Sequence, residues 1–353
     1  MKRLVLIDGN AIIHRAFHAL PPLTNKEGVV VNAVYGFFSM FLKILEDQKP
    51  DFITVCFDRP KPTFRKELFV GYQAKRPAMA SDLSPQFKLV HEVLEAAKVE
   101  IFEVDGYEAD DLIGTISVQA ISASHVARRN KSAKSEQRNA NSEELEVMIV
   151  SGDRDLLQLV NHRVKMIAPV TGLTNMIIYD SAKVEEKFGI KPAQVVDYKA
   201  LVGDASDNYP GVAGVGPKTA AILLNEYGSL EEIYKNLEKI KAKNPNLALK
   251  LAEGAESAGL AQKLAGIVLN APIKLDIEKA SLKLFDKEGL KKEFEKFGFK
   301  SLLNRLDNPT SRLLRRSGYE GRARLRGASK KQEISDKKKD ESKKPEVKQM
   351  ELL

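Results

Sequence analysis

Short runs of β-branched and aliphatic residues alternate with longer segments of helical periodicity along the first half of the chain. The runs with the length and composition of strands are Leu4–Ile7, Phe52–Phe57, Glu100–Val104, Val147–Val150, Val164–Ile167 and Met176–Tyr179. Apolar residues recur at helical spacing between them, as in Val31–Glu46, Ser84–Ala97 and Asp110–Ala120. This alternation predicts an α/β fold with a mostly parallel, twisted sheet flanked by helices.

After Tyr179 the periodicity becomes almost entirely helical. The segments that carry it are Lys183–Phe188, Pro192–Leu201, Pro217–Tyr227 and Leu230–Leu237, and a last amphipathic stretch covers Leu290–Leu306. We therefore expect an α/β core over residues 1–180 and a helical subdomain over residues 181–306.

Two polar segments fall outside both parts. Residues 122–144 are rich in Ser, Asn and Lys and are far longer than a connection between a helix and a strand needs, so we expect a disordered insertion there. Residues 307–353 cannot bury a core, which predicts a disordered tail. The excess of 56 Lys and Arg over 48 Asp and Glu lies mostly in this basic tail.

The composition excludes several classes of protein. Cys56 is the single cysteine, which excludes a disulfide framework and a Cys-rich zinc site. His14 and His18 have the spacing of a helical zinc pair, but Arg15 follows His14 where a metalloprotease helix has Glu, so zinc is a weak alternative. The first apolar stretch ends at Asp8, too early for a signal peptide, and no run of 18 apolar residues could cross a membrane. We expect a soluble, cytoplasmic protein with no membrane partner.

Acidic residues follow the predicted strands at the point where each strand ends. The acids at these positions, and at the end of one helix of the second part, are Asp8, Asp58, Glu108, Asp110, Asp111, Asp153, Asp155, Asp204 and Asp207. Because the carboxyl ends of parallel strands meet at one edge of a sheet, we expect these acids to converge, although each alone could be a helix N-cap. So many carboxylates repel one another unless cations neutralise them. Oxygen ligands alone favour Mg²⁺ or Mn²⁺ and a two-metal site for phosphoryl chemistry.

A glycine-rich segment, Gly211–Ala220, is not a P-loop, because Pro217 separates the last glycine from the lysine. Its glycines form a tight turn, and the proline suits the first position of a helix. Backbone N–H groups and a lysine at such a helix start can hold a phosphate. The pattern predicts a helix-hairpin-helix over about residues 195–228, although a simple glycine turn before a helix is the alternative. The residues expected to contact a DNA backbone are Gly211, Gly214, Gly216, Lys218 and Thr219.

A basic segment with interleaved aromatic residues, about residues 59–82, follows the second predicted strand. We interpret it as a basic, aromatic-bearing connection over the acidic edge, with an amphipathic surface helix as the alternative. Cations of this segment, such as Arg65, could contact phosphates, and an aromatic ring could stack on an unpaired base.

At this point the motifs LIDGNAIIHRAFHALPPLTNKEG, FDRPKPTFRKELFVGY, GYEADDLIGT, SGDRDLLQLV and LVGDASDNYPGVAGVGPKTA can be compared with a known family. The chain resembles the 5′→3′ exonuclease domain of bacterial DNA polymerase I, and through it the flap endonucleases, over about residues 1–306 apart from the insertion. The resemblance implies a metal-dependent nuclease of the PIN/FEN-like fold that hydrolyses DNA near 5′ ends and flaps during replication and repair. It also implies that residues 59–82 form a helical arch.

The resemblance also implies the cofactors and the residues that act. Two Mg²⁺ ions, or Mn²⁺ in their place, are bound by the nine acids, and a monovalent cation such as K⁺ is expected at the hairpin. Arg65, Lys75 and Arg76 are expected to assist catalysis, and Arg15 and Tyr72 to contact DNA. The implied partners are branched, flapped or nicked DNA, including RNA-primed DNA, with a DNA polymerase and a ligase acting on the same substrates. We expect a monomer associated with the bacterial nucleoid.

One departure from the family pattern concerns the arch. The family motif Tyr-Lys-x-x-Arg is here Tyr72-Gln73-Ala74-Lys75-Arg76, so glutamine stands where the family has lysine. Lys75 is the alternative source of the missing charge, although on a helix a shift of two residues points about 200° away from Gln73. The sequence therefore predicts weakened phosphate stabilisation by the arch.

Two other functions remain as alternatives. A non-catalytic DNA-binding protein would keep the hairpin but lose acids, and a metal-dependent ribonuclease of related α/β type would keep the acids without needing the hairpin. This chain has both features, which favours a DNA nuclease.

Overall fold

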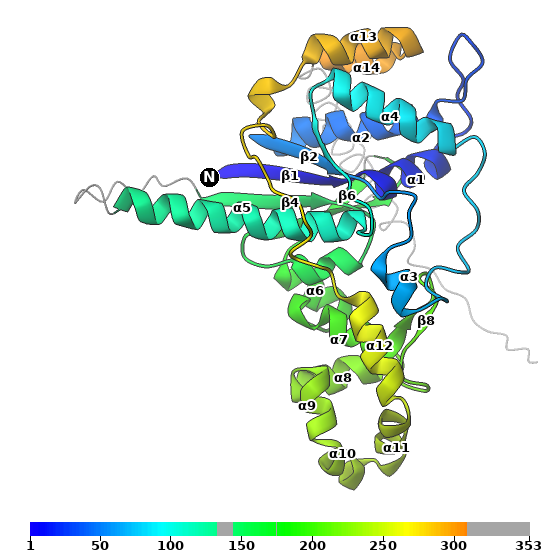
Figure 1. The fold of residues 1–353 in the computed structure, drawn as a ribbon, viewed down its shortest axis with the longest axis vertical. Coiled ribbons are helices and arrows are strands. Elements are labelled where there is room, and N and C mark those ends of the chain that lie inside the picture. Colours follow the sequence, from blue (N-terminus) through cyan, green and yellow to red (C-terminus); the bar gives the residue numbers. More distant parts are fainter. Residues whose placement is uncertain (133–143, 174, 309–353) are drawn as a thin grey trace, which may run out of the picture. The chain divides into compact units, whose positions relative to one another are not determined.

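A six-stranded sheet with the order β3-β2-β1-β4-β5-β6 lies at the centre of the computed structural model, which describes residues 1–132, 144–173 and 175–308 (Figure 1). All six predicted strands are present. They are β1 (Lys2–Asp8), β2 (Phe52–Cys56), β3 (Glu100–Phe102), β4 (Leu145–Val150), β5 (Val164–Thr171) and β6 (Asn175–Tyr179).

The sheet is parallel from β3 to β5 and antiparallel only between β5 and β6. The prediction of a mostly parallel sheet is confirmed. After β1 the chain builds β2 and β3 on one side of it and β4 and β5 on the other. Ligand sites of open α/β sheets form outside the carboxyl ends of the strands at such a reversal. Asp8, the last residue of β1, lies at this position.

Helices cover both faces of the sheet (Figure 1). On one face lie α1 (Gly9–Ala19), α2 (Asn32–Gln48) and α4 (Ser84–Ala96), and on the other lies α5 (Ala109–Ser132). Because both faces are covered, the central strands are apolar on both sides and the side chains from Leu4 to Ile7 are almost completely buried.

Helix α5 continues further than the sequence pattern predicted. Residues 122–132, expected to belong to a disordered insertion, form its last turns. This part contains no Gly or Pro, and its Ala and Arg residues favour helix, so the hydrogen-bond ladder is not interrupted. Residues 133–143, the rest of the predicted insertion, and residues 309–353 of the predicted tail lie outside the described residues.

A helical part follows β6. Its helices are α6 (Ser181–Phe188), α7 (Val195–Val202), α8 (Pro217–Tyr227), α9 (Leu230–Lys235), α10 (Leu237–Lys243), α11 (Pro245–Glu253) and α12 (Ala255–Ala265). Two short strands, β7 (Gly203–Asp204) and β8 (Tyr209–Pro210), pair between α7 and α8. Residues 1–302 form one compact unit, so this helical part packs on the core as a subdomain of it.

The last amphipathic stretch forms two helices instead of one. Helix α13 (Lys287–Phe297) packs against α4 and ends at Gly298, whose φ of 72° stops the helix, and α14 (Lys300–Asp307) follows. None of the helices in the described residues is both long and apolar enough to cross a membrane.

The predicted helical arch, residues 59–82, is mostly irregular. It contains one short helix, α3 (Phe64–Leu68), followed by turns. Gln73 adopts a left-handed backbone with φ of 56°, and its N–H donates to the carbonyl of Asp207 at 2.8 Å. A right-handed helix cannot contain that conformation, so the helical interpretation of this segment was wrong, and with it the helical comparison of Gln73 with Lys75.

Candidate metal and DNA site

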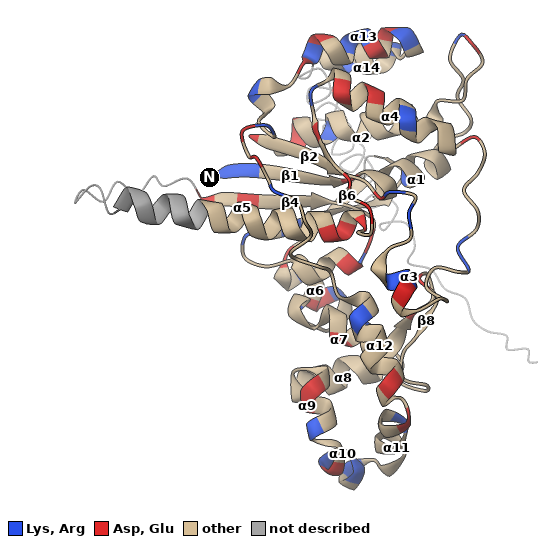
Figure 2. Cartoon of the chain, viewed as in Figure 1, with Lys and Arg blue, Asp and Glu red and all other residues tan. Residues whose placement is uncertain are grey.

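The acidic residues of the sequence pattern lie near the carboxyl edge of the sheet and the facing hairpin. Figure 2 shows acidic residues at the first turn of α5, next to the ends of β1 and β2. The acids also influence one another, since Asp8, Asp58 and Glu108 each raise the pKa of Asp110, and Asp204 raises that of Asp153. The structure divides them into groups with different surroundings.

The first group, which we call the strand-end cluster, consists of Asp8, Asp58, Asp110 and Asp153. Asp8 caps α1 by accepting a hydrogen bond from the N–H of Ala11 at 2.9 Å, and it accepts a second from the Ser151 hydroxyl at 2.6 Å. Burial raises the pKa of Asp8 to about 7, and the neighbouring carboxylates of Asp58 and Asp153 add to that rise.

The other members of the strand-end cluster also have raised pKa values. Asp58 accepts a hydrogen bond from the Ala109 N–H at 2.6 Å, and Asp153 accepts one from the Asp155 N–H at 2.9 Å. Burial is the largest cause of the raised pKa of Asp58, Asp110 and Asp153. None of the ion pairs among the described residues includes a member of this cluster. Asp8 is buried, Asp110 and Asp153 are half-buried and Asp58 is exposed. Four neighbouring carboxylates without a paired cation form a donor set that fits a hard divalent cation.

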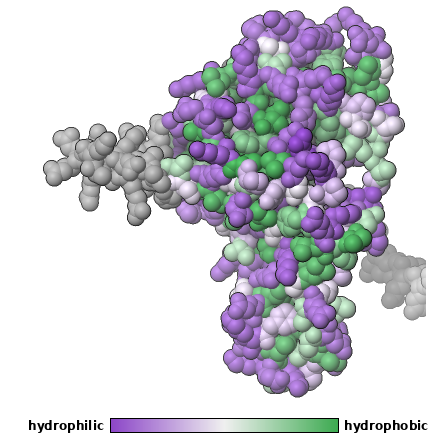
Figure 3. Space-filling view, in the orientation of Figure 1, coloured by the Kyte–Doolittle hydropathy of each residue, from purple (hydrophilic) through white to green (hydrophobic). Residues whose placement is uncertain are grey.

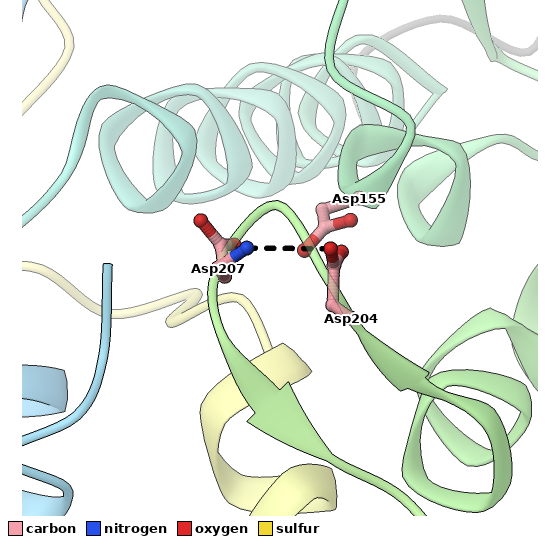
Figure 4. A group of neighbouring side chains, drawn as sticks. All are labelled: Asp155, Asp204 and Asp207. Carbon is pink, nitrogen blue, oxygen red and sulfur yellow. Dashed lines mark hydrogen bonds between the residues drawn. The ribbon is translucent and has the colours of Figure 1, made fainter. Parts of the chain in front are cut away.

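The second group, which we call the hairpin-side cluster, consists of Asp155, Asp204 and Asp207 (Figure 4). One carboxylate oxygen from each lies within 4.8 Å of the others, close enough to share a metal ion. Asp155 follows β4 in a short 3₁₀ turn, whereas the other two come from β7 and the turn after it. The Asp207 N–H donates to Asp204 at 3.3 Å, which holds the turn closed.

Basic side chains already contact the hairpin-side cluster. The Lys199 ammonium forms an ion pair with Asp155 and lies 2.5 Å from Oδ2 of Asp204. Burial alone would raise the pKa of Asp204, but Lys199 outweighs it and the pKa is lowered. Arg76 donates to Oδ1 of Asp207 at 2.6 Å. Sequence reasoning missed Lys199, whose only signal was its place on the helix that leads to Asp204.

Glu108 and Asp111 differ from the acids beside them. Burial raises the pKa of Glu108 to about 7, and its carboxylate accepts hydrogen bonds from the hydroxyls of Thr63 at 3.1 Å and Tyr72 at 3.2 Å. Asp111 is completely buried and is paired with Arg65 through two contacts of 2.8 Å. The structure therefore does not present the Asp111 carboxylate to the edge as it presents its neighbours.

Two residues of the arch are not placed as the sequence analysis expected. Tyr72 is 4% exposed, and its ring stacks on Tyr209 with centroids 6.4 Å apart, so it is not available to stack on a DNA base. Arg65 is 3% exposed and donates only to protein groups, so it does not face a phosphate. Arg76 is half exposed at the acidic cluster, and Lys75 is exposed.

The glycine segment forms the turn that precedes α8, and Pro217 is the first residue of that helix. A Cβ on Gly203 would lie 2.4 Å from the backbone nitrogen of Gly211, so the two strands approach too closely for any side chain. Gly216 caps α8, Lys218 is exposed in its first turn, and Thr219 beside it is half-buried.

A second lysine lies over this hairpin. Its ammonium, on Lys250 of α11, is 2.9 Å from the position that a Cβ of Gly214 would take. Sequence reasoning missed this residue, because nothing in the spacing linked α11 to the glycines. The hairpin therefore presents two cations, one at the start of α8 and one over the turn.

Arg15 of α1 is partly exposed and donates to the carbonyls of Val170 at 2.8 Å and Gly172 at 3.4 Å. These contacts fasten α1 to the connection between β5 and β6. The expected role of Arg15 in DNA binding stays a prediction.

The comparisons with known proteins agree with this geometry. Residues 3–128 match the family described as "5′-3′ exonuclease, N-terminal resolvase-like domain", and residues 190–288 match "5′-3′ exonuclease, C-terminal SAM fold". These ranges include all nine acids except Asp153 and Asp155, and they include the whole hairpin.

Curated relatives match over most of the chain. A "5′-3′ exonuclease" from Aquifex aeolicus is 35% identical over 307 residues, which cover 87% of this chain and 96% of that protein. The "DNA polymerase I" of Bacillus caldotenax is 40% identical over 310 residues, which cover 88% of this chain. The chain spans about a third of the length of that relative, 33%.

Among solved structures, the fold is similar to that of the bacteriophage T5 D15 flap endonuclease. That structure is described as a pseudo-enzyme-product complex with DNA and metal ions. The TM-score is 0.59 with 19% sequence identity, and the match covers 84% of this chain and all of that one. At this identity the similarity establishes the fold alone.

Proposed function

The chain belongs to the 5′-3′ exonuclease family, and from this membership we propose that it hydrolyses DNA phosphodiester bonds near free 5′ ends and flaps with two bound Mg²⁺ ions. The observation that carries the proposal is the strand-end cluster. Its four carboxylates, of which Asp8 is buried, Asp110 and Asp153 are half-buried and Asp58 is exposed, come from separate segments and have no paired cation among the described residues. Such a cluster is stable in its ionised form only when cations bind to it.

The two clusters suggest how two metal ions would be shared. Asp8, Asp58, Asp110 and Asp153 would hold one ion, with Glu108 beside them, and the hairpin-side cluster would hold the other. Divalent ions at such a site supply an activated water and neutralise the charge that develops on the phosphate oxygens. Because Mn²⁺ accepts the same oxygen ligands, it should replace Mg²⁺.

The basic residues of the chain would position the DNA. Arg76, half exposed and 2.6 Å from Asp207, lies where it can move from that carboxylate to the scissile phosphate. Lys218 and the glycine hairpin would bind the duplex backbone without reading bases, as the N–H groups of a helix start do for phosphates. A monovalent cation such as K⁺ at the hairpin is part of the proposal. The substrates are flapped or nicked DNA, which a polymerase supplies and a ligase seals.

A cleavage assay with four labelled substrates tests the proposal. A 5′-flap, a nicked duplex, an RNA-primed duplex and a single strand are each incubated with the chain in Mg²⁺ and, separately, in EDTA. We expect cleavage of the branched substrates near the 5′ end in Mg²⁺ and none in EDTA. Binding of flap DNA without cleavage in Mg²⁺ or Mn²⁺ would instead support a non-catalytic DNA-binding protein, and preferential cleavage of RNA a ribonuclease.

A further inference from the structure

Asp111 and Arg65 form an ion pair that is buried on every side. The side chain of Asp111 is 0% exposed and that of Arg65 is 3% exposed. The two residues lie 46 positions apart in the sequence. The guanidinium meets the carboxylate with both terminal nitrogens, Nη1 to Oδ2 and Nη2 to Oδ1, each at 2.8 Å. This two-point geometry is the strongest arrangement of an arginine and a carboxylate.

Backbone N–H groups donate the remaining hydrogen bonds to the Asp111 carboxylate. The N–H of Val268 donates to Oδ1 at 2.8 Å, and the N–H of Glu108 donates to Oδ2 at 3.1 Å. A carboxylate offers about four lone-pair positions, and four donors from the protein now use them. Little capacity is left on Asp111 for a metal ion.

Protein acceptors also use the N–H groups of Arg65. Nε donates to the carbonyl of Leu264 at 2.9 Å, and Nη2 donates to that of Gly266 at 2.8 Å, besides the contacts with Asp111. Nη1 also lies 3.4 Å from Oε2 of Glu108. With its donors turned inward and its side chain buried, Arg65 has nothing to offer a phosphate.

The next residue along α5 shows the contrast. The Asp110 carboxylate accepts no hydrogen bond from the described residues, and burial first, then the nearby carboxylates of Asp153 and Asp8, raise its pKa. Consecutive positions on a helix point about 100° apart, so Asp110 and Asp111 face different surroundings from adjacent places. Asp110 therefore faces the acidic edge, whereas Asp111 faces α3 and the end of α12.

We propose that Arg65 and Asp111 are positioning residues that form a clamp, which holds the first turn of α5 against α3 and against residues 264–268. The clamp fixes where Glu108 and Asp110 stand, and it ties the irregular arch to the acidic edge at its base. It replaces the roles that the family resemblance suggested, a metal ligand for Asp111 and a catalytic cation for Arg65. The inference rests on the proposed function, because the residues it positions are the proposed metal ligands.

The roles can be separated because a clamp acts through both partners together. Breaking a buried pair leaves one uncompensated charge, whereas removing both charges relieves the penalty. A true metal ligand gives no such recovery, since its oxygen is missing in the double variant as well. The variants are Arg65→Met, Asp111→Asn and the two combined. Arg65→Lys is the conservative change, because it keeps the positive charge but cannot donate two parallel hydrogen bonds to the carboxylate.

Three measurements are made on each variant of the full chain. Urea unfolding in EDTA reports the metal-free fold, titration calorimetry with Mn²⁺ reports the number and affinity of bound ions, and single-turnover cleavage of flap DNA gives the rate. Asp153→Asn is the control for loss of a ligand. The exposed pair of Lys88 and Glu92 on α4, changed to Met and Gln, is the control for loss of a surface ion pair and should leave all three readouts unchanged.

We expect each single clamp variant to unfold at lower urea in EDTA and to bind Mn²⁺ about 10- to 100-fold more weakly, with the number of ions kept. The urea midpoint of the double variant should return most of the way to that of the parent chain. The double variant should also bind the same number of Mn²⁺ ions as the parent. The urea midpoint and the Mn²⁺ affinity of Arg65→Lys should lie between those of the parent chain and those of Arg65→Met. If the singles fail to fold while the double folds, the clamp is supported by that recovery alone.

The proposal is overturned if Asp111→Asn loses one bound Mn²⁺ ion without losing stability in EDTA, as Asp153→Asn should, or if the folded double variant stays one ion short. A failure of the proposed function looks different. In that case the parent chain itself fails to cleave flap DNA, while the stability and Mn²⁺ titrations of the variants still decide whether the clamp exists.

Discussion

The strand-end cluster and the hairpin-side cluster contain the same kind of side chain but different surroundings. In the first, the buried Asp8 and the half-buried Asp110 and Asp153 have no paired cation among the described residues, and loss of hydration is the largest cause of their raised pKa. In the second, Lys199 bridges two aspartates and Arg76 contacts the third. A carboxylate pattern alone does not distinguish the two situations.

The difference indicates that the two clusters differ in their affinity for a metal ion. The strand-end cluster gains more from a divalent ion, because no side chain of the described residues forms an ion pair with its carboxylates. At the hairpin-side cluster an incoming ion must displace the ammonium of Lys199, so the gain is smaller. We therefore expect the strand-end cluster to bind its ion more tightly.

The largest expected effect comes from the strand-end cluster. Asp153→Asn should lower the single-turnover rate of flap cleavage by about 1,000-fold, because preorganised charge at the reacting phosphate is lost. Binding of flap DNA should persist, since the backbone affinity comes from cations such as Lys218. Rapid-quench kinetics and fluorescence anisotropy measure the two quantities. Asp105→Asn, an exposed acid, is the matched control, and a parallel loss of binding and cleavage would count against this division of roles.

Removing the resident cation of the hairpin-side cluster should have a smaller effect. Lys199→Met should destabilise the metal-free chain by about 2 kcal/mol, because Asp155 and Asp204 lose their partner. Added Mn²⁺ should then raise the unfolding midpoint more than in the parent, since no ammonium competes with it. Thermal unfolding with and without Mn²⁺ measures both, with the exposed Lys183→Met as control. An unchanged response to Mn²⁺ would mean that Lys199 does not occupy the ion's place.

A third expected effect is a dependence of stability on pH in the absence of metal. The pKa of Asp8 rises from its usual 3.8 to about 7, so the folded chain keeps a proton that the unfolded chain releases. The stability from this group is complete below about pH 4 and is lost as the pH rises through 7. Asp8→Asn should therefore reduce the fall in the free energy of unfolding with rising pH by at most about 1.4 kcal/mol per pH unit. Urea unfolding in EDTA between about pH 5 and pH 8 measures the slope, and parallel curves for both proteins would contradict the assignment.

Much of the fold could be predicted from the sequence because its signals are local. Strand composition, helical spacing and the acids that follow strands are each properties of a few neighbouring residues, and all six predicted strands form. The arch was misjudged because its basic and aromatic residues also suit an amphipathic helix. Its turns depend on a contact with a distant residue, the hydrogen bond from Gln73 to Asp207.

The sequence by itself determined that Asp8 and Asp58 lie at the carboxyl edge, since each ends or closely follows a strand of the parallel sheet. Only the tertiary structure decided which acids of the sequence pattern are neutralised from within the chain. Asp111 meets Arg65 from 46 residues earlier, and Asp155 meets Lys199 from a later helix. An ion pair forms only when two side chains come within a few ångströms, and the packing of distant segments sets that distance. Adjacent acids such as Asp110 and Asp111, indistinguishable in the motif, therefore acquire different surroundings.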